Sequence, residues 1–335
     1  MKYANAREQF IDWGTLSWKP STITAYRSDL EIIASTIGDT SKLTLSAFTR
    51  ESIRKAFSTY GAGKAKTTIE RRRSTWRLFF DFLVSENLVP GSPMGAVRKV
   101  KLGQRHPKPL KGWDEDLDYK LLVQLRDGCR YVGHECPKPP QRCQRHPFIE
   151  LDMAIIAMLF ATGFRASELL SLNIGSIEGR RGKQTITVTG KGDVERTVPI
   201  EPLLDDLLGK YLDGRRERYP TWKPKDSDPL FCTFKTEGTA GGIRMNPAQL
   251  DYFLRTALQS AGFGNAAQRG TMAHAFRHTY GTGLVASGAP ILQVRTLMGH
   301  KSVATTEGYV DLLMEEARSA AGGNTLYKAL ERISI

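Results

Sequence analysis

The spacing of apolar residues predicts helices over most of the first third of the chain. A Pro-Ser-Thr start signal at residues 20–22 precedes Ile23, Tyr26, Leu30 and Ile33, which follow one another at intervals of three or four residues. This spacing places apolar side chains on one face of a helix. We therefore expect a helix that begins near residue 20 and buries that face.

A second apolar stripe, between residues 67 and 83, is rich in aromatic side chains and has basic residues at its entrance and on its other face. The stripe consists of Ile69, Trp76, Phe79, Phe80 and Leu83, and the basic residues are Lys64, Lys66, Arg71, Arg72 and Arg73. We expect the aromatic side chains to form core. The basic side chains are expected to face outward, as suits docking on a nucleic-acid duplex.

Beyond residue 113 the pattern predicts further helices and one β-hairpin. Residues 151–172 are helical in pattern, with a break at Thr162-Gly163. Residues 184–189 and 196–200 alternate apolar and polar positions on either side of a Gly-rich turn, which is typical of a hairpin. Asn246-Pro247 is a helix-start signal. The expected fold class is mainly α with a small antiparallel β-sheet.

Charge and composition divide the chain into three parts. Residues 1–112 hold 20 of the 48 basic and 9 of the 35 acidic side chains, a net charge of +11 out of +13. Residues 96–112 contain six basic residues and two prolines without apolar periodicity, which indicates a linker. We therefore expect a basic helical domain over 1–95, a basic linker over 96–112 and a second domain over 113–335.

The composition excludes several classes of protein. With 335 residues, of which 40% are hydrophobic and 25% charged, the chain is expected to be globular. No window approaches the ~18 consecutive apolar residues of a membrane span, and the N-terminus lacks the apolar region of a signal peptide. Four cysteines make no disulfide framework. We expect a cytoplasmic protein whose basic excess binds a polyanion, either nucleic acid or a membrane surface.

Four short segments of the second domain contain residue types suited to phosphate chemistry. They are ATGFRASELLSL (161–172), TGKGD (189–193), HAFRHTYGT (274–282) and LMGHKSVATTEGYV (297–310). On these segments the sequence resembles the tyrosine recombinase (phage integrase) family. The resemblance covers the second domain segment by segment, which implies that 113–335 is the catalytic domain. It covers the N-terminal domain more loosely and implies that 1–95 is a helical, SAM-like core-binding domain that binds DNA.

The resemblance implies a set of catalytic residues. They are Arg165, Lys191, His274, Arg277, His300 and the nucleophile Tyr309, with Glu168 as an accessory acidic residue that braces the site. Two guanidinium groups suit a transition state that gathers negative charge on phosphate oxygens. A phenol with a pKa of about 10 needs a base or a cationic pocket, and His274 is the expected proton acceptor. Lys191 would protonate the leaving 5′ oxygen, and His278 is expected to be structural support.

The resemblance also implies a function and partners. We expect a site-specific recombinase that cleaves and rejoins DNA through a 3′-phosphotyrosyl intermediate, for integration and excision of a phage or mobile element. Xer-like chromosome or plasmid dimer resolution is an alternative. A type IB topoisomerase is another, against which the helical first domain and the C-terminal tail argue. A non-catalytic DNA-binding regulator would not need the four intact segments.

The expected partner is double-stranded DNA at core sites, so the cytoplasmic protein is expected to be nucleoid-associated. No metal, other cofactor or ATP is expected to take part. The side chains expected to bind DNA are Lys64, Lys66, Arg71, Arg72, Arg73, Lys99 and Lys101. The tail, at about 311–335, is expected to assemble a homo-tetramer on DNA, with an accessory DNA-bending protein as an optional partner. No further arm-binding domain is expected before residue 20.

An insertion at about 127–147 is not explained by the resemblance. It contains Cys129, His134, Cys136, Cys143 and His146 within 18 residues. A Cys3His set is an accepted ligand set for structural zinc, although the spacing matches no standard finger. A basic, Pro-rich loop with free thiols is the alternative, and the sequence leaves both open.

Overall fold

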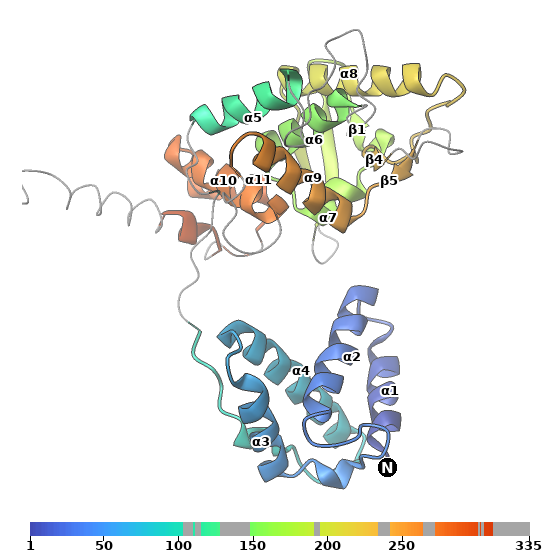
Figure 1. The fold of residues 1–335 in the computed structure, drawn as a ribbon, viewed down its shortest axis with the longest axis vertical. Helices are drawn as coiled ribbons and strands as arrows, with labels where there is room; N and C mark the ends of the chain where they lie inside the picture. The colour runs from blue at the N-terminus through green and yellow to red at the C-terminus, as the bar shows by residue number, and fades with distance from the viewer. Residues whose placement is uncertain are drawn as a thin grey trace, which may run out of the picture. The chain divides into compact units, whose positions relative to one another are not determined.

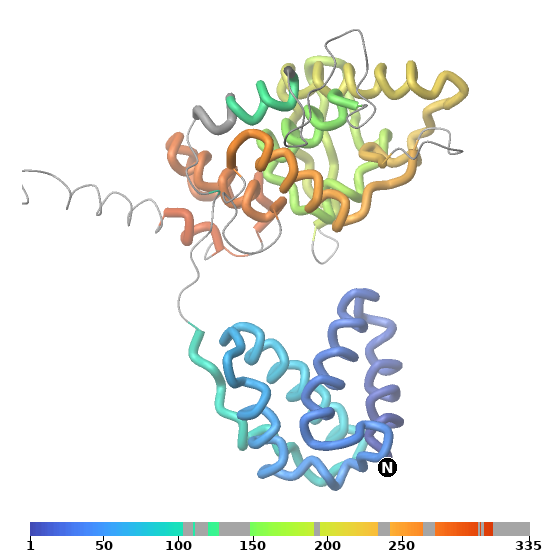
Figure 2. The backbone as a smooth tube through the Cα atoms, viewed as in Figure 1, coloured from blue at the N-terminus to red at the C-terminus, as the bar shows by residue number. Residues whose placement is uncertain are grey.

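A computed structural model describes the chain in two separate units, Met1–Gln104 and Arg105–Ile335 (Figures 1 and 2). The described residues are 1–102, 110, 115–127, 148–190, 195–233, 242–263, 272–300, 302 and 305–310. Within these parts, every helix is too short or too polar to cross a membrane.

The N-terminal unit is built from helices around an aromatic core. Its helices are α1 (Tyr3–Gly14), α2 (Pro20–Ala34), α3 (Arg50–Gly61) and α4 (Lys66–Ser85), with 3-10 turns at Leu45–Ala47 and Pro93–Ala96. The predicted start of α2 is confirmed, since Pro20 occupies its first turn, where no backbone donor is needed. Trp76 and Phe79 of α4 are fully buried with Phe10 of α1, so the aromatic stripe forms core, as predicted.

The basic run of α4 is divided between this core and the surface. Arg72 is only 8% exposed, and its Nε donates to Oδ1 of the fully buried Asp29 at 3.1 Å. Arg71 donates to the same oxygen at 2.7 Å, but its side chain is 52% exposed. The prediction that the whole run faces outward is therefore wrong for Arg72. It lies one helical turn before Trp76 and so shares the buried face.

The second unit contains helices and two small sheets. The helices are α5 (Glu115–Asp127), α6 (Ile149–Thr162), α7 (Ala166–Ser171), α8 (Pro202–Arg218), α9 (Pro247–Ser260), α10 (Met272–Ala286) and α11 (Ile291–Met298), with a 3-10 turn at Ile174–Ser176. The strands are β1 (Ile177–Glu178), β2 (Thr185–Thr189), β3 (Glu195–Pro199), β4 (Cys232–Thr233) and β5 (Ile243–Arg244). β1, β2 and β3 form one antiparallel sheet in that order, and β4 pairs with β5.

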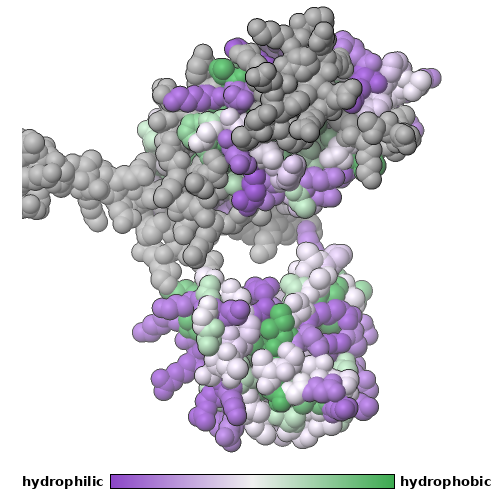
Figure 3. Space-filling model, viewed as in Figure 1, coloured by the Kyte–Doolittle hydropathy of each residue, from purple (hydrophilic) through white to green (hydrophobic). Residues whose placement is uncertain are grey.

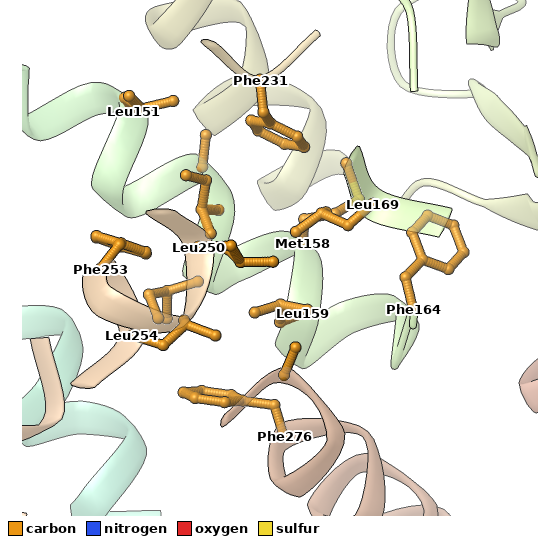
Figure 4. Close-up of a cluster of buried hydrophobic side chains, with 14 of the residues drawn as sticks. Leu151, Met158, Leu159, Phe164, Leu169, Phe231, Leu250, Phe253, Leu254 and Phe276 are labelled. Atoms are coloured by element: carbon orange, nitrogen blue, oxygen red, sulfur yellow. The ribbon is translucent and has the colours of Figure 1, made fainter. Parts of the chain in front are cut away.

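Helix α6 is the centre of this unit, because α5, α8 and α10 all pack against it. Its side chains are buried on several sides, which accounts for its continuous apolar pattern. Figure 4 shows Met158 and Leu159 of α6 among Leu250 and Leu254 of α9 and Phe276 of α10.

The predicted helix break and hairpin are both confirmed. Helix α6 ends at Thr162, and the Gly163 that caps it has a left-handed φ of 57°. The hairpin pairs β2 with β3, with Ile186 opposite Val198 and both side chains buried. The other three strands have two residues each, too few to show alternation in a sequence. The mainly α fold class with small antiparallel sheets is confirmed.

Candidate active site

A buried carboxylate, that of Glu168, is the centre of the candidate site. Glu168 lies in the first turn of α7, directly after the break at Gly163, and is 2% exposed. The backbone N–H of Arg165 donates to its Oε2 at 2.8 Å, and Nη1 of Arg165 donates to its Oε1 at 2.6 Å. The short helix thus fixes Arg165 and Glu168 against each other.

A second arginine, Arg196 of β3, binds the same carboxylate and was not predicted from the sequence. Its Nη1 and Nη2 donate to the two Glu168 oxygens at 2.9 and 2.8 Å. Arg196 shares the inward face of its strand with Val198, two residues on. A charged residue at an inward position of a strand needs a buried partner. The alternation of inward and outward positions over residues 196–200 therefore contained a signal that could have identified Arg196.

The third arginine, Arg277 of α10, is held by helix ends. It is 1% exposed, its Nη1 donates to the Gly163 carbonyl at 2.8 Å, and its Nη2 donates to the Met298 carbonyl. These carbonyls terminate α6 and α11, where the helix dipole favours a cation. The left-handed turn at Gly163 thus turns a carbonyl towards the guanidinium.

The charges in this cluster do not balance. Burial alone would raise the pKa of Glu168, but the Arg196 and Arg165 guanidinium groups lower it to about 2. Burial and the nearby Arg165 lower the pKa of Arg277 to about 10, so it stays cationic at neutral pH. Three arginines therefore surround one carboxylate, with Arg277 Nη1 3.9 Å from Oε2. The excess positive charge is suited to an anion such as a phosphate.

The histidines of the site are kept neutral. Burial, Arg277 and Arg165 lower the pKa of His274, which lies one turn before Arg277 on α10. His300 follows the left-handed Gly299 after α11, and its Nδ1 is 2.9 Å from Thr306 Oγ1. Burial, followed by Arg277, lowers the pKa of His300 to about 4.

Tyr309 is buried beside these groups, with 1% of its surface exposed. Its hydroxyl lies 2.9 Å from His278 Nδ1, and its ring is parallel to that of His300 with centroids 6.1 Å apart. Burial raises the pKa of Tyr309 to about 12, although Arg277 and Arg165 act in the opposite direction. The phenol is therefore protonated at neutral pH.

The structure thus brings together most of the predicted catalytic side chains. Those gathered around the arginine cluster are Arg165, Glu168, His274, Arg277, His300 and Tyr309. Lys191, the zinc-ligand candidates at 129–146 and the tail at 311–335 lie outside the described residues. In the described parts of the chain, no three His, Cys, Asp or Glu side chains are grouped as metal ligands would be.

The predicted DNA-binding residues lie in the N-terminal unit in differing surroundings. Lys64, Lys66, Lys99 and Lys101 are exposed, and hydrophilic side chains are spread over the face of this unit that Figure 3 shows. Arg73 instead donates to Glu70 at 3.0 Å and to the Val97 carbonyl at 2.9 Å. Arg72 and Arg73 therefore make contacts within the domain, and their binding to DNA stays a prediction.

Guanidinium groups braced by a carboxylate, with three histidines and a tyrosine beside them, form a group suited to binding a phosphate. Comparison with known proteins identifies its family. The model of the Phage integrase family matches residues 139–316, and that of the phage integrase N-terminal SAM-like domain matches residues 15–87. The chain belongs to the phage integrase family of tyrosine recombinases.

The similarity to several known recombinases covers most of the chain. Tyrosine recombinase XerC of Corynebacterium efficiens is 28% identical over 321 residues, covering 94% of this chain and 90% of that protein. Tyrosine recombinase XerC of Alcanivorax borkumensis is 30% identical over 297 residues, covering 88% and 84%. The structure of XerH site-specific recombinase bound to palindromic difH substrate is similar in fold, with a TM-score of 0.67 and 21% identity over 90% of this chain and 79% of that chain.

Proposed function

We propose that this protein cleaves and rejoins DNA strands at specific sites through a covalent link between Tyr309 and a 3′ phosphate. The observation that carries the proposal is the buried Tyr309 beside three arginines that share a single carboxylate. A phosphodiester entering this site meets an excess of fixed positive charge. Such preorganised charge stabilises the pentavalent transition state without reorganisation.

Arg165 and Arg277 would bind the non-bridging oxygens of the scissile phosphate. Arg165 is the more accessible, with a side chain 31% exposed, whereas Arg277 is held from behind by two carbonyls. Glu168 and Arg196 would orient Arg165 without touching the DNA. His274 and His300 would add hydrogen bonds to the same oxygens. Both rings are close to Arg277, whose charge lowers their pKa values.

The reaction would proceed in two transesterifications. The Tyr309 oxygen attacks phosphorus, the bond to the 5′ oxygen breaks, and that oxygen takes a proton, for which Lys191 is the proposed donor. A 5′ hydroxyl from the same or another strand then attacks the phosphotyrosine and releases the phenol. Each step exchanges one phosphodiester for another, so no external energy source is required.

Two biological settings fit this chemistry. The similarity to XerC proteins along most of both chains favours Xer-like resolution of chromosome or plasmid dimers. Integration and excision of a phage or mobile element is the second setting, supported by the match to the Phage integrase family. In both, we propose double-stranded core sites as substrate, a homo-tetramer on DNA through the C-terminal tail, and an optional DNA-bending protein.

The decisive experiment is covalent trapping. Sites are first selected from random duplex DNA with the full chain, and a nicked duplex carrying a selected site is then incubated with the protein. We expect a protein–DNA adduct that survives denaturation, is lost in Tyr309→Phe and is kept in Tyr252→Phe, where the tyrosine is 58% exposed. An adduct formed by Tyr309→Phe, or none formed by the wild type, refutes the proposal.

A further inference from the structure

We propose that His278 orients the Tyr309 phenol and accepts its proton when the phosphotyrosyl bond forms. This inference rests on the proposed function and assigns a role that the sequence had given to His274. It is carried by the contacts of Tyr309.

The phenol oxygen is held by His278. Nδ1 of His278 is 2.9 Å from the Tyr309 hydroxyl, and the two ring centroids are 5.8 Å apart at an angle of 53°. His278 lies on α10 directly after Arg277. The helix that fixes Arg277 therefore also fixes the partner of the nucleophile.

The position of the ring is set by close packing. A Cβ on Gly281 would lie 2.8 Å from Cε1 and Cζ of Tyr309 and 2.8 Å from Met298 Sδ. The missing side chain at Gly281 thus makes room for the phenol one turn from His278. The His300 ring lies parallel to the Tyr309 ring, with the two centroids 6.1 Å apart. In this packing the phenol is confined and its hydroxyl is directed to His278.

The charge state of His278 suits an acceptor. Burial, followed by His274, Arg277 and His300, lowers the pKa of His278 to about 3, so its ring is neutral at pH 7 and has a free nitrogen lone pair. Among the described residues, the charged and titratable groups that face it are those three residues and Tyr309. A bound phosphate adds negative charge to this group and makes protonation of His278 more favourable.

The step balances without a further reactant. As the Tyr309 oxygen bonds to phosphorus, its O–H bond breaks and the proton moves to Nδ1 of His278, which becomes an imidazolium. The 5′ oxygen leaves with a proton from the general acid. In the rejoining step the imidazolium returns its proton to the departing phenolate, so His278 is neutral again at the end.

The test compares three variants in single-turnover cleavage of the nicked substrate. His278→Asn keeps a hydrogen-bonding group of similar size but cannot hold a full proton, His278→Ala removes both properties, and His274→Asn tests the alternative acceptor. General acid–base catalysis contributes about 10²–10⁴-fold. We expect His278→Asn and His278→Ala both to cleave at least about 100-fold more slowly than wild type, with unchanged DNA affinity.

A second substrate separates the acceptor from the general acid. When the 5′ bridging oxygen is replaced by sulfur, the leaving group needs no proton, so loss of the general acid is rescued and loss of the acceptor is not. We expect no rescue for the His278 variants. A His278→Asn rate within about threefold of wild type, or rescue by sulfur, overturns the inference. If His278→Asn is active while Tyr309→Phe forms no adduct, this inference alone fails; if Tyr309→Phe forms the adduct, the proposed function fails.

Discussion

Replacing Glu168 by Gln removes the negative charge that three arginines share, and it should destabilise the second unit strongly at neutral pH. The wild-type carboxylate accepts two hydrogen bonds from Arg196 and two from Arg165. A Gln side chain has one acceptor oxygen, and its NH2 group would point donors at a guanidinium. Buried cations left without their partner are costly.

The magnitude follows from the pKa of Glu168, which is lowered from 4.5 to about 2. At about 1.4 kcal/mol per pKa unit, the ionised carboxylate contributes roughly 3 kcal/mol to the free energy of unfolding. Because the pKa in the folded state is lowered, this contribution is complete above about pH 4.5 and is lost as the pH falls towards 2. The difference between wild type and variant should shrink over the same range.

The assay is urea unfolding of the full chain at pH 7 and at several values down to pH 3. Glu178→Gln, the same substitution at an exposed position of β1, is the matched control and should change stability by less than about 0.5 kcal/mol. The unfolding transition of the N-terminal unit, which lacks Glu168, is an internal reference. A loss below about 1 kcal/mol at pH 7, or a loss that does not depend on pH, would refute the reasoning.

Two further predictions concern the turn at Gly163 and the contribution of Lys99 to DNA binding. Gly163→Ala should cost about 3 kcal/mol, because φ is 57° and the new Cβ would lie 2.3 Å from Tyr280 Cδ1. The control is Gly262→Ala, where φ is 85° and a new Cβ would have no atom within 4 Å, so the loss of stability should be only about 1 kcal/mol. Thermal unfolding of both variants measures the difference. Equal losses of stability would contradict the packing argument. Lys99→Gln should weaken DNA binding and reduce the slope of log affinity against log salt by about 0.9, measured by fluorescence anisotropy. An unchanged slope would remove Lys99 from the phosphate contacts.

Much of the local structure was predictable because short-range patterns determine it. The break at Gly163 was visible in the sequence, since a Gly after an apolar helix adopts the left-handed turn that ends it. The hairpin was visible as two alternating segments around a Gly-rich turn. Asn246 caps α9 as predicted, with its side chain accepting the Gln249 N–H at 2.9 Å.

Charged residues were harder to predict, because their partners lie far away in the sequence. Arg72 looked like a DNA-binding residue in a basic run, but Asp29, 43 residues earlier, binds it inside the core. Arg196 is 28 residues from Glu168, and no pattern over a few residues connects the two positions. A periodic pattern gives the face of a helix or strand on which a residue lies, but not the partner that this face meets.

The sequence by itself determined the family, the helical character of both units and which residue types would handle a phosphate. Only the tertiary structure decided how they are paired with distant residues: Glu168 with Arg196, Arg277 with two helix ends, and Tyr309 with His278. The physical reason is that secondary structure follows from interactions over a few residues. Charge pairing, burial and pKa shifts follow from packing, which joins residues separated by 28 to 114 positions.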